Sequence, residues 1–418
     1  MSSRVGDGLF PARQANDARS LTVRSMSRIC MRGQVEFERN SNRGGRAPIL
    51  FRVDPGYAWR RLFPSLYILP PNVSSQIHRR LLHLSSNRAI MAVCARSPAV
   101  LDACNATARG SASFSIQVSR TEAYVETGIL GGGSFGVVLQ ARHRVTGNTV
   151  AIKFLRSTVH RPADPSRLLE EARFLGACDG NPYVVAYYGL VHDPATADLG
   201  LAMEYVGPSL HTFLSERPPL LEGIVCCYMW QLLTGAKMMH QRGIVHRDIK
   251  PANILVEGGG KMLKFCDLGL AMSLATKETP YGDVGTMPYK PPEMILGKPN
   301  YDGRVDTWSL GCVMAEMLTG QRMFPGLGDD DEVKQLWVIF RRVGFPDETT
   351  WPELASLPLA RMVPRWTQAR QQQSTLREMF HEEMLSNEGF QVLKGLLECN
   401  PDKRLTAAAA LQLPWFQH

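Results

Sequence analysis

The sequence lacks two features that would place it in other classes of protein. No run of about 18 apolar residues occurs, so no transmembrane helix and no membrane partner is expected. None of the nine cysteines belongs to a C-x-x-C pair, and several lie in apolar surroundings. The thiols are therefore predicted to be reduced and mostly buried, in a protein that stays inside the cell, in the nucleus, the cytoplasm or both.

Lysine is absent from the first 120 residues, although the chain as a whole is basic, with a net charge of +8. This segment holds eighteen arginines and six acidic residues, a net charge of +12, which leaves −4 for the rest. The basic charge therefore belongs to the N-terminal segment. It gives no reason to expect that the folded part binds nucleic acid.

Residues 1–120 also lack sustained helical or alternating hydrophobic periodicity, and they are rich in Arg, Ser, Ala, Asn and Pro. We expect this segment to be disordered. Three other interpretations stay open. The Arg-rich start over residues 1–32 is typical of an organellar targeting peptide, and a basic arm could contact nucleic acid or acidic partners. The third interpretation is that translation starts downstream, for example at Met91, so that residues 1–90 do not belong to the protein.

The later sequence is organised around the stretch His246-Arg247-Asp248-Ile249-Lys250-Pro251-Ala252-Asn253. It places an Asp, a Lys and an Asn in one tight loop between a helix and a short strand. Upstream, three glycines with G-x-G-x-x-G spacing, at 131, 133 and 136, lie between two strand-like runs. Glycines there let backbone amides approach phosphate groups without a side-chain clash. A strand on both sides favours a hairpin over the strand-to-helix turn of a dinucleotide fold.

The next apolar strand, Val150-Ala151-Ile152-Lys153, contains a lysine, which is costly unless the charge is paired. The helix expected over 165–177 offers Glu170 and Glu171 as partners.

These motifs, in this order, resemble those of eukaryotic protein kinases. The resemblance implies an α+β fold with two lobes. Residues 121–207 would form an N-terminal lobe with a small antiparallel β-sheet and one regulatory helix, and 208–418 a mainly helical lobe. It also implies ATP and Mg²⁺ as cofactors and a protein as substrate.

The resemblance assigns roles to individual residues. Asp248 would accept the proton of the attacking hydroxyl, and Lys250 would steady the transferring phosphoryl group. Lys153 would bridge the ATP phosphates and pair with Glu171, which has the family's spacing to Leu175, whereas Glu170 would face solvent. Asn253 and Asp267 would hold Mg²⁺. The other ATP-binding residues would be Leu130, Gly131, Gly132, Gly133, Ser134, Phe135, Gly136, Val138, Ala151, Met203, Glu204, Val206 and Leu255.

The resemblance also predicts structural contacts outside the chemistry. Leu268 replaces the usual Phe after Asp267, and it is apolar enough to fill the same buried slot. Glu293 should pair with Arg404, and Asp306 should brace the backbone of the catalytic loop.

Within the kinases, the segment 301–358 is very similar to cyclin-dependent kinases, and the departures resemble the plant F-class. This implies a Ser/Thr kinase, to which Thr286 and Lys250 also point, with activation loops of other cyclin-dependent kinases or the RNA polymerase II tail as possible substrates. The alternative is a catalytically weak, kinase-like scaffold. Retention of Lys153, Glu171, Asp248 and Asp267 favours the enzyme.

Several departures bear on regulation. Glu170 and Met272 stand where two phosphate-binding arginines would be expected, which leaves Arg247 as the third. Activation by phosphorylation of Thr279 or Tyr281 is therefore an open question. Cyclin binding is open too, because the helix 165–171 keeps only the first two residues of the family's cyclin-contact pattern. Lys290 replaces an arginine that supports proline-directed choice.

Overall fold

The computed structural model describes residues 117–133, 136–155, 164–196, 198–275, 284–326, 332–362 and 374–417. The chain divides into two units, Met1–Leu82 and His83–His418, and every described residue belongs to the second. The predictions for residues 1–116, and those for Ser134, Phe135, Thr279 and Tyr281, lie outside the described residues.

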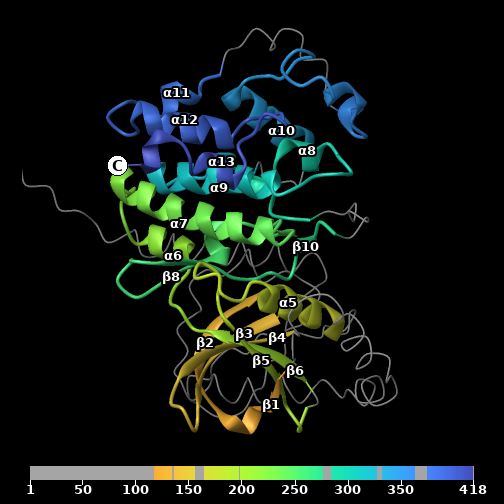
Figure 1. Ribbon diagram of the computed structural model, residues 1–418, viewed down its shortest axis with the longest axis vertical. Coiled ribbons are helices and arrows are strands. Elements are labelled where there is room, and N and C mark those ends of the chain that lie inside the picture. The colour runs from red at the N-terminus through yellow and green to blue at the C-terminus, as the bar shows by residue number, and fades with distance from the viewer. Residues whose placement is uncertain are drawn as a thin grey trace, which may run out of the picture. The chain divides into compact units, whose positions relative to one another are not determined.

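The first lobe is a six-stranded sheet with one helix (Figure 1). The strand order is β1-β5-β6-β4-β3-β2. The strands are β1 (Val118–Arg120), β2 (Tyr124–Gly133), β3 (Gly136–His143), β4 (Thr149–Leu155), β5 (Tyr187–His192) and β6 (Leu199–Glu204), with a short 3₁₀ turn η2 (Thr121–Ala123). The hairpin of β2 and β3 carries the three glycines, as the sequence predicted.

Two details of the predicted sheet are wrong. Residues 118–120, which fall in the segment predicted to be disordered, form strand β1, and β1 pairs parallel with β5 in an otherwise antiparallel sheet. The backbone explains the pairing, because Leu190 N donates to Gln117 O at 2.8 Å and covers the edge of β5. Strand β5 begins only at Tyr187. The buried Asn181 instead shapes a turn, since its Oδ1 accepts from Tyr183 N at 3.1 Å.

Helix α5 (Pro165–Ala177) has the bounds that the sequence predicted. Asp164 caps it by accepting from Ser166 N at 3.0 Å, and proline occupies the first turn, where its missing N–H costs nothing. Leu168, Ala172 and Leu175 form its buried face. This face packs the helix against β5 and β6 and fixes its orientation.

The second lobe is mainly helical. Its helices are α6 (Leu210–Ser215), α7 (Glu222–Gln241), α8 (Pro292–Ile295), α9 (Arg304–Thr319), α10 (Glu332–Val343), α11 (Leu376–Met379), α12 (Asn387–Leu396) and α13 (Ala407–Ala410). The short strands are β7 (Ile244–Val245), β8 (Ile254–Val256), β9 (Leu263–Phe265) and β10 (Met272–Ser273). The 3₁₀ turns are η3 (Pro251–Asn253), η4 (Met287–Tyr289), η5 (Leu354–Ser356), η6 (Ala360–Met362) and η8 (Pro414–Phe416).

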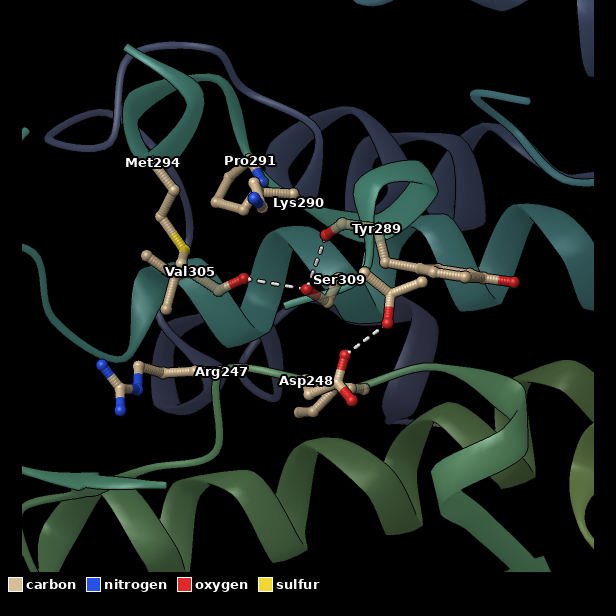
Figure 2. A pocket seen from close by; sticks show the side chains of 10 residues that line it. Arg247, Asp248, Tyr289, Lys290, Pro291, Met294, Val305 and Ser309 are labelled. Atoms are coloured by element: carbon tan, nitrogen blue, oxygen red, sulfur yellow. Dashed lines mark hydrogen bonds between the residues drawn. The ribbon is translucent and has the colours of Figure 1, made fainter. Parts of the chain in front are cut away.

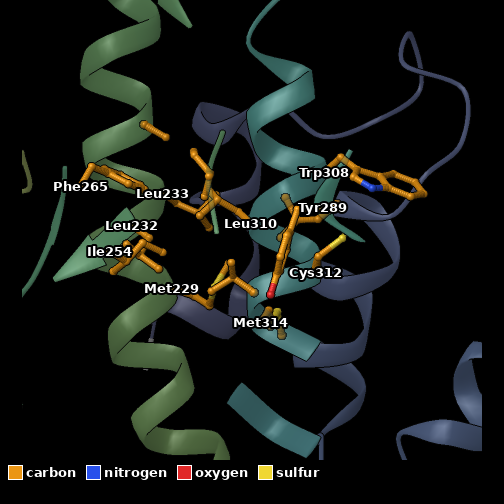
Figure 3. Close-up of a cluster of buried hydrophobic side chains, with 14 of the residues drawn as sticks. Met229, Leu232, Leu233, Ile254, Phe265, Tyr289, Trp308, Leu310, Cys312 and Met314 are labelled. Atoms are coloured by element: carbon orange, nitrogen blue, oxygen red, sulfur yellow. The ribbon is translucent and has the colours of Figure 1, made fainter. Parts of the chain in front are cut away.

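The core of this lobe lies between α7 and α9. Figure 3 shows Met229, Leu232 and Leu233 of α7 facing Leu310 and Met314 of α9. All five are completely buried. The two-lobed α+β fold is thus confirmed. Among the described residues, no helix is long and apolar enough to cross a membrane.

Candidate active site

The backbone of the catalytic loop is held in an unusual conformation by one carboxylate. Arg247 has φ = 68°, a left-handed value that a large side chain seldom adopts. Asp306, the third residue of α9, accepts from His246 N and Arg247 N, both at 2.9 Å. His240 Nε2 lies 2.8 Å from the same carboxylate. The predicted brace is therefore confirmed, and α9 sets the strained loop that presents Asp248.

Three side chains converge on Asp248, which is 8% exposed. Thr286 Oγ1 donates to Oδ1 at 2.6 Å, and Lys250 Nζ donates to Oδ2 at 2.8 Å and to Thr286 Oγ1 at 2.7 Å. Asn253 Nδ2 donates to Oδ2 at 2.9 Å. Asp248 is thus a carboxylate held in one orientation, and it can accept a proton from a hydroxyl brought to it.

Lys153 on β4 joins the two lobes. Its Nζ lies 2.9 and 2.7 Å from the two oxygens of Glu171 and 2.7 Å from Asp267 Oδ1. Glu171 is 2% exposed, whereas Glu170 is exposed on the same helix. The choice of Glu171 over Glu170 is confirmed, because only Glu171 lies on the buried face of α5.

The charges of this network control its pKa values. Burial alone would lower the pKa of Lys153, but the neighbouring carboxylates of Glu171 and Asp267 outweigh it and raise this pKa. Burial would raise the pKa of Asp267, yet the Lys153 ammonium brings it below its ordinary value. Burial dominates at Glu171 and raises its pKa. Lys153 therefore stays cationic and Asp267 anionic at neutral pH.

Asn253 and Asp267 fit a divalent cation. The amide nitrogen of Asn253 donates to Asp248, which leaves its oxygen as the atom for a metal. Cys266 N donates to Asn253 O at 3.0 Å, so the two ligand segments are adjacent. The side chain of Asp267 keeps 42% exposure beyond its contact with Lys153. No cluster of three or more acidic, His or Cys ligands occurs among the described residues.

Most of the apolar residues predicted around an adenine ring belong to one extended core. Ala151 on β4 pairs with Met203 on β6, and both are buried. Val138, Val206 and Leu255 are half-buried and pack on the same core. Leu130 on β2 is 42% exposed. The pairing of β4 with β6 thus brings Ala151 and Met203 together.

The glycines of the hairpin differ in what surrounds them. A Cβ on Gly131 would meet no atom within 4 Å, and one on Gly132 would meet only Gly136 O at 3.9 Å. A Cβ on Gly136 would lie 2.0 Å from Phe154 O. The first two leave open space over the backbone, as a phosphate site needs, whereas Gly136 is required by the packing of β3 on β4.

Two residues beside Asp267 have structural roles. Leu268 is completely buried in the main core, so it fills the slot expected for an apolar side chain there. Asp267 itself has φ = 62°, a second left-handed residue at the site. Burial raises the pKa of the Cys266 thiol, which indicates an unreactive cysteine.

The predicted pair of Glu293 and Arg404 is confirmed. The two guanidinium nitrogens lie 2.5 and 2.7 Å from the two carboxylate oxygens, and both side chains are completely buried. Arg404 also lies over the ring of Trp308, at 4.9 Å. This bidentate pair anchors the segment that carries Thr286 to the C-terminal part of the lobe.

A pocket borders Asp248 (Figure 2). Its lining combines the catalytic loop with the segment around η4, α8 and α9: Arg247, Asp248, Ile249, Thr286, Tyr289, Lys290, Pro291, Met294, Val305 and Ser309. Ser309 donates to Tyr289 O at 2.8 Å and ties α9 to η4. An apolar wall of proline, methionine and valine thus lies beside the proton acceptor.

The sequence interpretation missed two side chains that hold the site. His240 bonds Asp306, and Lys264 bonds Glu204. Lys264 is an isolated polar residue in the apolar strand β9, whereas His240 lies at the end of α7 and is followed by Gln241 and Arg242. The pattern at Lys264 signals a paired group, but it does not name the partner.

Comparison with known proteins agrees with this geometry. Residues 124–416 match the family described as protein kinase domain. The rice protein "Putative cyclin-dependent kinase F-2" (Oryza sativa subsp. japonica) is 43% identical over 304 residues, which cover 71% of this chain and 90% of that protein. The chain is also 35% identical over 293 residues to cyclin-dependent kinase G-2 of rice (Oryza sativa subsp. indica), and 35% over 296 residues to cyclin-dependent kinase G1 of Arabidopsis thaliana.

The matches to the two G-class proteins cover 68% of this chain, but only 40% and 47% of those proteins. The match to the F-class protein spans nearly the whole relative. Together with the paired Lys153 and Glu171 and the constellation around Asp248, these matches identify the chain as a member of the protein kinase family, in its cyclin-dependent kinase branch.

Proposed function

We propose that the protein transfers the γ-phosphoryl group of ATP to serine or threonine hydroxyls of protein substrates, with Mg²⁺ as the metal. The observation that carries this proposal is the joint hold of Lys250 and Thr286 on Asp248. These two side chains hold the carboxylate in one orientation, and its Oδ atoms would receive the proton of a serine or threonine hydroxyl that is brought to it.

Each residue of the site then has one task. Lys153 would hold the ATP phosphates, and Glu171 keeps Lys153 in place. Asn253 and Asp267 would hold Mg²⁺, which neutralises charge on the phosphates when bound. Asp248 orients the hydroxyl, whose oxygen forms the new bond to phosphorus as the bond to the ADP oxygen breaks. Such catalysis consists mainly of positioning and electrostatics.

For substrates, we propose activation loops of other cyclin-dependent kinases or the RNA polymerase II tail. This rests on the likeness to an F-class protein. The nucleus and cytoplasm are the proposed locations. Activation by a cyclin remains part of the test, because α5 keeps only the beginning of the cyclin-contact pattern.

The test is phosphate transfer by the full chain from ATP-Mg²⁺ to an activation-loop peptide and to a polymerase-tail peptide, alone and with candidate cyclins. Asp248→Asn serves as the blank, and phosphoamino acid analysis identifies the acceptor. We expect phosphoserine or phosphothreonine in at least one peptide. ATP binding without any transfer would favour a kinase-like scaffold, and phosphotyrosine would contradict the proposed acceptor.

A further inference from the structure

The side chain of Glu204 lies where the two lobes meet, and it receives three hydrogen bonds. Lys264 Nζ lies 2.7 Å from its Oε1 and 2.9 Å from its Oε2. Ala186 N donates to Oε2 at 3.0 Å. The two charged side chains are only 15% and 24% exposed. A pair so shielded, with a backbone donor as a third partner, is screened less than an exposed surface pair.

The pair of Glu204 and Lys264 connects the end of strand β6 with strand β9. Glu204 is the last residue of β6 and begins the connection to the helical lobe, and its backbone N–H donates to Ala186 O at 2.9 Å. Lys264 is the central residue of β9, three positions before Asp267. One ion pair therefore links the start of the connection between the lobes to the strand that leads to the metal ligand.

The backbone reinforces this link. Phe265 N donates to Tyr183 O at 2.8 Å, and Val185 N donates to Phe265 O at 3.0 Å. Strand β9 of the helical lobe is thus hydrogen-bonded to the segment that leads into β5 of the sheet. The end of β6, this segment and β9 form one junction, and the side chains of Glu204 and Lys264 close it.

We propose that Lys264 and Glu204 are positioning residues for ATP, since their ion pair sets how the connection between the lobes stands relative to Asp267. This rests on the proposed function. The pair keeps the adenine-binding edge, with Met203 and Val206, at a fixed distance from the phosphate-binding groups. ATP spans both regions. If the junction is loosened, the two halves of the site must be brought into order when ATP binds, and the affinity for ATP falls.

The pair could instead serve only the stability of the fold, and the two roles predict different measurements. A positioning role weakens ATP binding and raises KM for ATP, while kcat changes little because Asp248 and Lys250 are untouched. A purely structural role lowers the melting temperature and leaves the ATP affinity of the folded protein unchanged. Both quantities are therefore measured on the same preparations.

The experiment compares Lys264→Met, Glu204→Gln and the double variant with the wild-type full chain. Lys264→Arg is the rescue, because it keeps the charge and can still reach the carboxylate. Lys298→Met is the matched control, since it removes an ion pair with the exposed Glu353 inside the helical lobe. Binding of a fluorescent ATP analogue, KM for ATP, kcat and the melting temperature are recorded for each.

Either single variant is expected to weaken ATP binding about 3- to 10-fold, a typical coupling for groups in direct contact. The double variant should bind ATP no more weakly than the worse single variant. Lys264→Arg should restore most of the affinity because it keeps the positive charge, and Lys298→Met should leave the affinity unchanged. Unchanged ATP affinity, or additive losses in the double variant, would overturn the proposal. Normal ATP binding without phosphate transfer by the wild type would contradict the proposed function instead. The ATP affinities of the variants would still test the role of the ion pair in that case.

Discussion

At the scale of single residues, the site depends on polar groups that are expensive to bury and are therefore fully paired. Asp306 is 1% exposed and supports the strained Arg247 backbone with two hydrogen bonds. Lys153 is 9% exposed and lies between two carboxylates. The apolar strand around Lys153 indicated that its charge needs a partner. The choice of Glu171 and the brace by Asp306 were implied by the resemblance to protein kinases.

Other residue contacts could not be predicted in this way. The bond from His240 to Asp306 joins positions 66 residues apart, and the bond from Lys264 to Glu204 joins positions 60 apart. A single sequence shows that such a residue needs a partner, but the partner follows only from how the elements pack.

Asp306→Asn tests the brace through pH. Burial alone would raise the pKa of Asp306, but the His240 hydrogen bond and nearby positive charge bring it below the ordinary 3.8. A depressed pKa gives stability that is fully present above pH 3.8 and is lost as the pH falls through the folded-state pKa. At pH 7 we expect the free energy of unfolding of the wild type to exceed that of Asp306→Asn by about 1–3 kcal/mol.

The measurement is urea unfolding of both proteins between pH 3 and 7. The difference in unfolding free energy should shrink as the pH falls below about 4. A difference that persists undiminished at pH 3 would show that Asp306 does not act as a buried carboxylate.

At the scale of elements, local patterns predicted well wherever a strand or helix is long or carries a cap. Helix α5 begins at its proline and ends as predicted. Strand β1 was missed because three residues carry too little periodicity, and because its pairing depends on the distant β5.

The hairpin of β2 and β3 provides a prediction at this scale. Gly136→Ala should lower the melting temperature even without ATP, because its Cβ would lie 2.0 Å from Phe154 O. Gly131→Ala meets no atom within 4 Å, so the fold should be unchanged while KM for ATP rises. Thermal unfolding with and without ATP checks both. Equal melting temperatures for wild type and Gly136→Ala would refute the steric argument.

At the scale of the whole molecule, the catalytic lobe is tied together by contacts between distant segments. Glu293 and Arg404 lie 111 residues apart and are both 0% exposed. Removal of one partner leaves a buried charge without compensation. Glu293→Ala is therefore expected to destabilise the protein by about 3–5 kcal/mol, measured by urea unfolding. Lys298→Met, which breaks a more exposed pair, should cost less than about 1 kcal/mol, and similar losses in both would contradict this ranking.

The most direct test of the account compares Asp248→Asn with Lys153→Met for ATP binding and for phosphate transfer. We expect Asp248→Asn to bind ATP like the wild type while its turnover falls by roughly 10²–10⁴-fold, because only the proton acceptor is lost. Lys153→Met should weaken ATP binding about 10- to 100-fold, since a charged contact is removed. Undiminished transfer by Asp248→Asn would contradict the assignment of Asp248, and with it the proposed mechanism.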